Sequence, residues 1–88
     1  MKLTNKVQVK NKMGLHTRPA TAIVKLLQKC KSNVSFTYRR ETINAKSILS
    51  ILMLAATRNS RITITVDGED AESTMQHLVN AFENHFEE

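Results

Sequence analysis

The sequence has few of the residues that mark disulfide-rich, fibrous or membrane-spanning proteins. Its 88 residues include one cysteine, one proline, two glycines and no tryptophan. The single cysteine, Cys30, cannot form an internal disulfide, which excludes a disulfide-stapled scaffold and favours a reducing cytoplasm. No apolar run is long enough to cross a bilayer, and the polar beginning MKLTNKVQVK lacks the apolar core of a signal peptide. We therefore expect one small globular domain over residues 1–88, in the cytoplasm and with no membrane partner.

The composition is that of an ordinary globular protein with an excess of positive charge. Hydrophobic residues make up 41% of the chain and charged residues 24%, which excludes a disordered composition. The formal net charge is +5, from 13 Lys and Arg against 8 Asp and Glu. This charge suits an acidic partner, but it does not choose between a nucleic acid and a protein.

Short segments of alternating polarity predict the strands of a sheet. Val7 and Val9 alternate with polar neighbours and predict a first strand that ends near Lys10. Similar alternation predicts strands over residues 33–38, 41–44 and 61–66. The side of this sheet away from the core, which water can reach, would carry Gln8, Ser35, Thr37, Thr63 and Thr65.

Three segments with helical spacing separate and follow these strands. Apolar residues from Ala20 to Cys30 predict the first helix, and a short helix begins near Ser47. Asp70 is the expected N-cap of a last helix that carries apolar residues as far as Phe82. The order βαββαβα predicts an α+β fold with helices on one side of a sheet. The pattern alone does not fix the strand order, and a ferredoxin-like order also fits.

The stretch GLHTRPA places His16, Arg18 and Pro19 at the start of the first helix. Proline is tolerated in a first helical turn, where free backbone N–H groups and the helix dipole favour an anion. The same field disfavours a protonated imidazole, and Arg18 adds a cation that can hold phosphate oxygens. This cluster suits an imidazole that accepts a phosphoryl group and passes it on. No second ligand lies at chelating spacing, so no metal is expected. The plain alternative is an exposed loop histidine beside a solvated arginine.

Three segments together resemble one family over essentially the whole chain. GLHTRPA resembles the active-site signature of HPr, the histidine-containing phosphocarriers of the bacterial phosphoenolpyruvate-dependent sugar phosphotransferase system. NAKSILSILMLAA resembles the second signature of that family, and RITITVDGEDAESTMQHLV resembles its last strand and helix. The resemblance implies an open-faced β-sandwich: a four-stranded antiparallel sheet in the order 1-4-2-3, with three helices packed on one face.

The same resemblance implies a function. His16 would be phosphorylated on Nδ1 by phospho-enzyme I and would donate the group to enzyme IIA domains. Arg18 would pair with the phosphoryl group, and Pro19 would shape the helix start. The protein would be a stoichiometric carrier, not an enzyme, with no cofactor, and we expect a monomer.

The short helix is more apolar than one buried stripe requires. If Ile51 and Leu54 face the core with Ala55, other apolar residues of the helix are left at least partly exposed, as at a partner surface. The alternative is that a neighbouring helix covers them. By resemblance, this helix and the first helix form one docking surface. Lys25, Lys29 and Lys46 are the candidates for positive charges around it. The expected partner-binding residues are Thr17, Ala20, Lys46, Ile48, Leu49 and Leu52.

Ser47 has two compatible interpretations. It precedes an apolar helical run, as an N-cap does, and it matches the serine that HPr kinase/phosphorylase modifies in many members of the family. The sequence also departs from the family, because Ala55 and Asn59 stand where glycine is common. The hairpin at Arg39–Arg40 lacks the usual Asn or Gly turn residues.

Two other functions remain to be weighed. One is a regulatory paralogue, either a nitrogen-branch carrier or a signalling HPr. The other is a small basic RNA-binding domain, which requires aromatic residues on the open face of the sheet. Phe36 and Tyr38 share the phase of the core residue Val34, which argues against a nucleic-acid partner.

Overall fold

The order of elements is the predicted one, and the computed structural model describes all residues from 1 to 88. Three of the elements are α-helices, and a short 3-10 turn, η1, follows the last of them. The elements are β1 (Lys2–Gln8), α1 (Thr17–Leu27), β2 (Asn33–Tyr38), β3 (Glu41–Asn44), α2 (Ile48–Leu54), β4 (Arg61–Asp67), α3 (Ala71–Glu83) and η1 (His85–Glu87). None of the helices has the length and apolar character needed to span a membrane.

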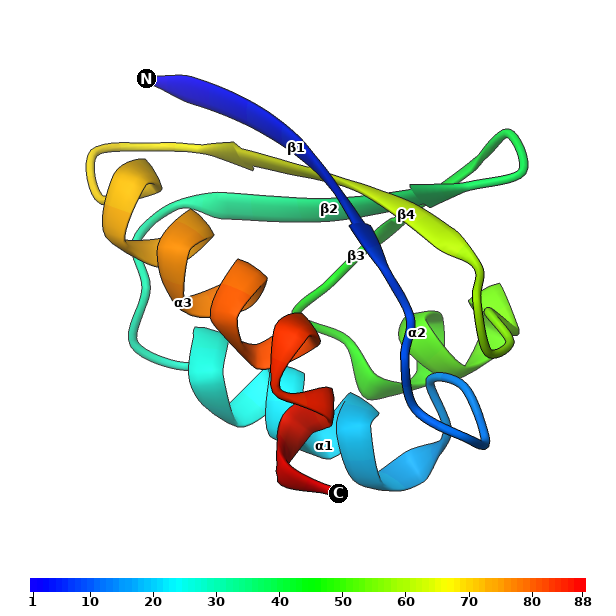
Figure 1. The fold of residues 1–88 in the computed structure, drawn as a ribbon. Coiled ribbons are helices and arrows are strands. Elements are labelled where there is room, and N and C mark those ends of the chain that lie inside the picture. Colours follow the sequence, from blue (N-terminus) through cyan, green and yellow to red (C-terminus); the bar gives the residue numbers. More distant parts are fainter.

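The four strands form one sheet in the order β1-β4-β2-β3, and every pair is antiparallel. This order confirms the open-faced β-sandwich and excludes the ferredoxin-like alternative. Figure 1 shows that the three helices lie on the same side of the sheet. Alternate residues of the strands point toward the helices, so Ile62, Ile64 and Phe36 are fully buried. Phe36 meets Phe82 of α3 edge to face, with ring centroids 5.8 Å apart.

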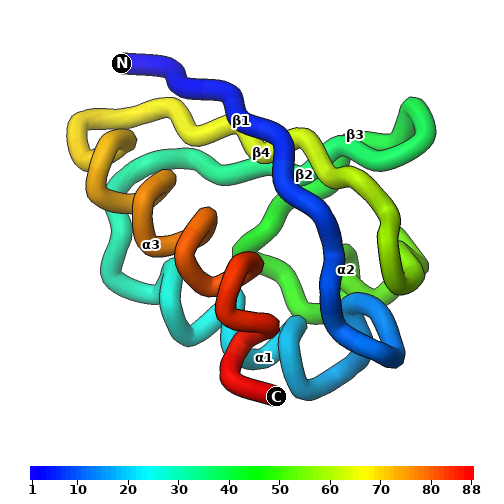
Figure 2. Tube along the Cα trace, viewed as in Figure 1, coloured from blue at the N-terminus to red at the C-terminus, as the bar shows by residue number.

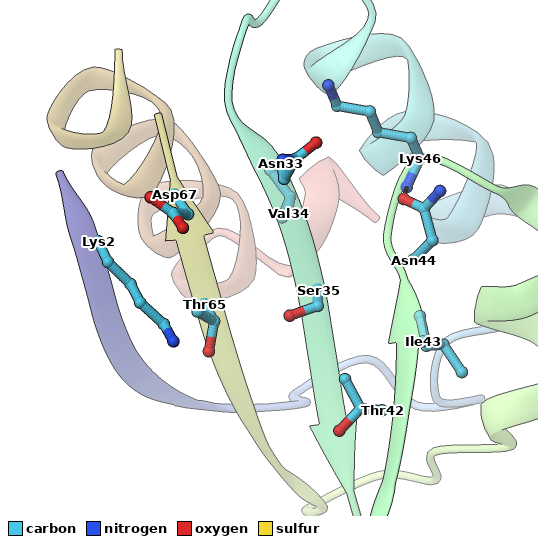
Figure 3. Close-up of a pocket in the computed structure, with 10 residues that line it drawn as sticks. All are labelled: Lys2, Asn33, Val34, Ser35, Thr42, Ile43, Asn44, Lys46, Thr65 and Asp67. Atoms are coloured by element: carbon cyan, nitrogen blue, oxygen red, sulfur yellow. Dashed lines mark hydrogen bonds between the residues drawn. The ribbon is translucent and has the colours of Figure 1, made fainter. Parts of the chain in front are cut away.

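The other face of the sheet carries short polar side chains, as the alternation predicts. Ser35, Thr42 and Thr65 stand on this face of three adjacent strands, and they line a shallow hollow with Lys46 at its rim (Figure 3). No aromatic side chain lines the hollow, and Phe36 is buried on the opposite side. The surface that an RNA-binding domain would need is therefore absent from this hollow.

Some helix and strand boundaries differ from the sequence prediction. β1 ends at Gln8, two residues before Lys10, and α1 ends at Leu27. Cys30 therefore lies beyond the helix, half-buried, where its Sγ donates to the carbonyl of Ser32. The helical spacing of apolar residues extends to Cys30, beyond the last residue of α1, because Cys30 still packs against the core.

Asp70 occupies the N-cap position of α3, but its side chain does not cap that helix. Its carboxylate accepts hydrogen bonds from the Lys31 backbone N–H, at 2.8 Å, and from the Ser32 hydroxyl. These two donors hold the pKa of Asp70 below its ordinary value, the Ser32 hydroxyl having the larger effect. Asp70 thus ties the start of α3 to the segment that follows α1.

The turn between β2 and β3 consists of Arg39 and Arg40. Both have positive φ, 51° and 71°, and Tyr38 pairs with Glu41 on either side of them. A two-residue hairpin turn needs this conformation, which Asn and Gly adopt more easily than arginine. The guanidinium of Arg39 lies 5.2 Å from the ring centroid of Tyr38, a cation–π contact that offsets part of the strain.

Candidate functional site

His16 lies at the N-cap of α1, where the sequence predicts it. Its backbone is extended, with φ −78° and ψ −169°, and its carbonyl accepts the first helical hydrogen bond from Ala20 N–H at 3.0 Å. The N–H groups of Thr17 and Arg18 have no intrahelical partner, and Pro19 has none to offer. Two free donors and the positive end of the helix therefore lie beside the imidazole.

Two loops fix the position of His16 relative to the sheet. The N–H of Leu15 donates to the carbonyl of Ala56 at 3.0 Å, next to the histidine. Further back, Val9 N–H donates to Ser60 O at 2.8 Å, and Asn59 N–H donates to Val9 O at 2.7 Å. The loop after β1 is thus bonded along its length to the loop before β4.

Gly14 explains why the signature begins with glycine. Its φ is +70°, and a Cβ at this position would lie 2.3 Å from the carbonyl oxygen of Ala56. Both the conformation and the close approach require a residue without a side chain. Because the same carbonyl accepts from Leu15, Gly14 sets how closely the His16 loop approaches the loop after α2.

His16 borders two hollows on the surface. One runs along α1, where Arg18 and Lys25 also line it. The other lies toward the loop after β1, and four further residues that can carry positive charge line it, Lys10, Lys12, Arg58 and His85. Both sides of the imidazole are therefore suited to anionic groups.

Glu88 is the one acidic residue that lines the second hollow. Its carboxylate oxygens lie 2.9 Å and 3.2 Å from His16 Nε2. The buried side chain of Asn11 donates from Nδ2 to the same carboxylate and, at 2.8 Å, to the carbonyl of His85. The Asn11 hydrogen bond, with smaller effects of His16 and Arg18, holds the pKa of Glu88 below its ordinary value against the opposing effect of desolvation.

No feature of the sequence predicts these contacts. Glu88 lies 72 positions from His16, and Asn11 lies 77 positions from Glu88. Figures 1 and 2 show the end of the chain beside the beginning of α1 and the loop that precedes it. A pattern that repeats along one element does not report a contact between the two ends of the chain.

Several apolar side chains around α2 are exposed, as the sequence predicts. Ile48 is 38% exposed and Leu49 is 67% exposed, and Leu52 is half-buried. Met53 is 70% exposed and Met13 is 73% exposed, so both add to the apolar surface that the protein exposes. Met53 was recognisable, because it lies four residues after Leu49 on one helical face. Met13 lies in a loop, where no periodicity identifies it.

Two sequence expectations for this surface are wrong. Ala20 is fully buried, so its side chain packs in the core and is not available to a partner. Ala55 does not face the core with Ile51 and Leu54: it ends α2 in the left-handed conformation, with φ 54°, and is exposed. The helical pattern failed there because the helix stops at Leu54.

The remaining predicted residues lie near the same surface. Thr17 is exposed at the first position of α1, and Lys46 is half-buried, with Nζ donating to the carbonyl of Cys30 at 3.4 Å. Ser47 is the N-cap of α2, and its Oγ accepts from Ser50 N–H at 3.2 Å, which confirms its structural interpretation. No group of three or more His, Cys, Asp or Glu side chains is arranged to hold a metal ion.

Comparison with known proteins agrees with this geometry. Residues 3–84 match the family model described as the PTS HPr component phosphorylation site. The chain is 38% identical over 86 residues to the phosphocarrier protein HPr of Xylella fastidiosa, covering 98% of this chain and 97% of that one. The chain belongs to the HPr family. It is thus a phosphocarrier of the phosphotransferase system, and its relatives are bacterial proteins.

Solved HPr structures share the whole fold. The crystal structure of HPr-C-His from Thermoanaerobacter tengcongensis superimposes with a TM-score of 0.94 at 31% identity, covering 98% of this chain and 97% of that one. A second structure, of the catabolite repression protein Crh of Bacillus subtilis, has a TM-score of 0.77 at 30% identity, covering 92% and 93%. That Crh is described as a dimer with a swapped domain.

Proposed function

We propose that this HPr accepts a phosphoryl group from phospho-enzyme I on Nδ1 of His16 and donates it to enzyme IIA domains. One observation carries the proposal. His16 lies at the N-terminus of α1 beside Arg18, and its Nε2 is in contact with Glu88, so Nδ1 is the ring nitrogen that has no hydrogen-bond partner. The family signature at this position supports the same assignment.

The chemistry needs no residue outside this cluster. The Nδ1 lone pair forms a bond to phosphorus while the bond from phosphorus to the donor breaks and returns its electron pair to the donor. The free N–H groups of Thr17 and Arg18, together with the Arg18 guanidinium, can hold the equatorial oxygens. Transfer to enzyme IIA reverses the step at the same atom. The protein is therefore consumed and regenerated stoichiometrically, and it is not a turnover catalyst.

The partner surface follows from the exposed side chains around His16. We assign it to Thr17, Lys46, Ile48, Leu49 and Leu52, with Met13 and Met53 added by the structure. Neither α1 nor α2 contains an acidic residue. Lys25 of α1 lines the hollow beside His16, and the exposed Lys29 follows the end of the same helix. Such a surface, apolar at its centre and basic at its rim, fits an acidic partner and speeds the encounter. Two partners that dock in turn are best served by a cytoplasmic monomer.

We also propose that Ser47 is a regulatory phosphorylation site. Its side chain borders the apolar surface of α2, and a phosphate there would lie at the positive end of that helix. The added charge beside Ile48 and Leu49 would weaken binding of enzyme I. We therefore expect HPr kinase/phosphorylase to be a further partner. The similarity to Crh is the observation behind a second candidate function, that of a regulatory paralogue not dedicated to sugar uptake.

The test is the intact mass of the protein after incubation with enzyme I and phosphoenolpyruvate. We expect one added phosphoryl group that is lost in acid, and none in His16→Ala. His77→Ala is the matched control, because this exposed histidine lies on α3 and should leave phosphorylation unchanged. If enzyme I that phosphorylates another HPr adds nothing to this protein, the carrier proposal fails and the regulatory paralogue is favoured.

A further inference from the structure

The segment from His85 to Glu88 folds back toward α1 in an unusual backbone conformation. His85, Phe86 and Glu87 all have positive φ, at 54°, 51° and 62°. Residues with side chains adopt this conformation at an energetic cost, and it persists where surrounding contacts hold it. Two contacts do so here: Phe86 packs on Phe82 with ring centroids 4.8 Å apart, and Asn11 donates to the carbonyl of His85 at 2.8 Å.

The result of this conformation is the contact between Glu88 and His16. An ionised carboxylate only accepts hydrogen bonds, so a bond to Nε2 requires the imidazole proton to be on Nε2. The neutral ring then has its lone pair on Nδ1, the atom that the proposed function uses. Aspartate orients the histidine of a serine-protease triad by the same logic.

We propose that Glu88 is a positioning residue for phosphoryl transfer: its carboxylate keeps the proton of His16 on Nε2 and stabilises the positive ring formed when Nδ1 is phosphorylated. This inference rests on the proposed function. When Nδ1 gives its lone pair to phosphorus, Nε2 keeps its hydrogen and the ring becomes cationic. The cation faces a carboxylate 2.9 Å away. When the phosphoryl group leaves, the electron pair of the P–N bond returns to Nδ1 and the ring is neutral again.

The surrounding charges keep this carboxylate ionised. Lys10, Lys12, Arg58 and His85 line its hollow, and Arg18 and Lys25 line the hollow on the other side of His16. The pKa of Glu88 lies below its ordinary value, so the side chain is an anion throughout the range in which imidazoles titrate. Without the Glu88 carboxylate, every other ionisable side chain that lines the two hollows beside His16 would be basic, and the phosphorylated ring would lose its proton more readily.

The experiment compares wild-type protein with Glu88→Ala and Glu88→Gln, and uses Glu87→Ala as the matched control. Glu87 is exposed and forms no hydrogen bond or ion pair with His16. Nitrogen NMR of the ring gives the tautomer, and a pH titration of the phosphorylated protein gives the midpoint for loss of the Nε2 proton. Backbone amide spectra establish that each variant is folded.

We expect the Nε2–H tautomer in wild type and Glu87→Ala, and a mixture of tautomers in Glu88→Ala. The midpoint of the phosphorylated ring should fall by about one pH unit in both Glu88 variants, a tenfold change in proton affinity. An unchanged tautomer in unphosphorylated Glu88→Ala, together with an unchanged midpoint in its phosphorylated form, would overturn the inference and leave the carrier function standing. Absence of phosphorylation in all four proteins would instead refute the carrier function, and the tautomers of the unphosphorylated proteins would still decide the role of Glu88 before transfer.

Discussion

At the scale of single residues, Ala55 shows how the chain tolerates local strain near the site. It ends α2 with φ 54°, in a position where helices usually have glycine. The left-handed conformation costs a residue with a Cβ about 1 kcal/mol or more relative to glycine. Asn59, at φ 73°, has a side chain that tolerates this conformation better.

We predict that Ala55→Gly stabilises the protein by about 1 kcal/mol, because glycine relieves the positive φ and Ala55 buries little surface. Urea unfolding followed by circular dichroism measures the change. Ala22→Gly is the control, since it lies inside α1 and should destabilise by about 1 kcal/mol. Equal losses of stability in both variants would show that the conformation of Ala55 carries no strain.

At the scale of elements, α2 depends on its first residue. Ser47 Oγ accepts from Ser50 N–H, and no acidic residue in the first turn compensates for the helix dipole. The helix has seven residues, so most of its stability comes from packing and from this cap.

We predict opposite effects of two substitutions at Ser47. Ser47→Ala should lose about 1 kcal/mol of stability through the missing cap and should keep its affinity for enzyme I. Ser47→Asp should keep stability close to wild type, because aspartate also caps helices, and should raise the KM in phosphorylation by enzyme I. Denaturant unfolding and initial phosphorylation rates separate the two effects. A normal KM for Ser47→Asp would argue against regulation through charge at this position.

The elements were predictable from sequence, and the contacts between distant segments were not. Alternation predicted all four strands, with β1 ending two residues earlier than expected, and the family resemblance predicted the strand order. The resemblance also placed His16 and Arg18 at the start of α1, where the structure has them. The helical spacing failed at Ala55, because a helical period does not say where a helix stops. At Ala20 it was right, since this residue belongs to the buried stripe of α1, and the error came from adding Ala20 to the partner surface. Glu88 was missed for a different reason: its position depends on three left-handed residues that have no sequence signal of their own.

At the scale of the whole molecule, charge is distributed unevenly along the chain. All 13 Lys and Arg lie between Lys2 and Arg61, and seven of the eight acidic residues lie from Asp67 onward. The acidic residues therefore run from the end of β4 through α3 to Glu88, which lies beside His16 in space. The chain before Asp67 is basic, with Glu41 as its one acidic residue. Asp70 and Glu88, one before and one after α3, both join this acidic part to the basic part through hydrogen bonds.

We predict that Asp70 contributes to stability in a pH-dependent way. Its pKa is lower in the folded protein than its ordinary value of 3.8, so the folded state binds fewer protons than the unfolded state. The stabilisation is complete above pH 3.8 and is lost as the pH falls through the lower folded value. Asp70→Asn should therefore be less stable at neutral pH and should lose less stability on acidification. Thermal unfolding from pH 2 to 7 measures this, with Glu72→Gln as control. Parallel curves for wild type and Asp70→Asn would contradict the assignment.

His16 is held by segments from widely separated parts of the sequence: the loop after β1, the loop before β4 and the residues that follow α3. None of these segments can position the imidazole alone. A partly unfolded copy would therefore present a histidine without the surroundings on which its proposed role as phosphoacceptor depends. Only correctly folded copies would then be able to carry phosphate. A damaged copy would stop accepting the phosphoryl group by itself, and no separate protein would be needed to detect it.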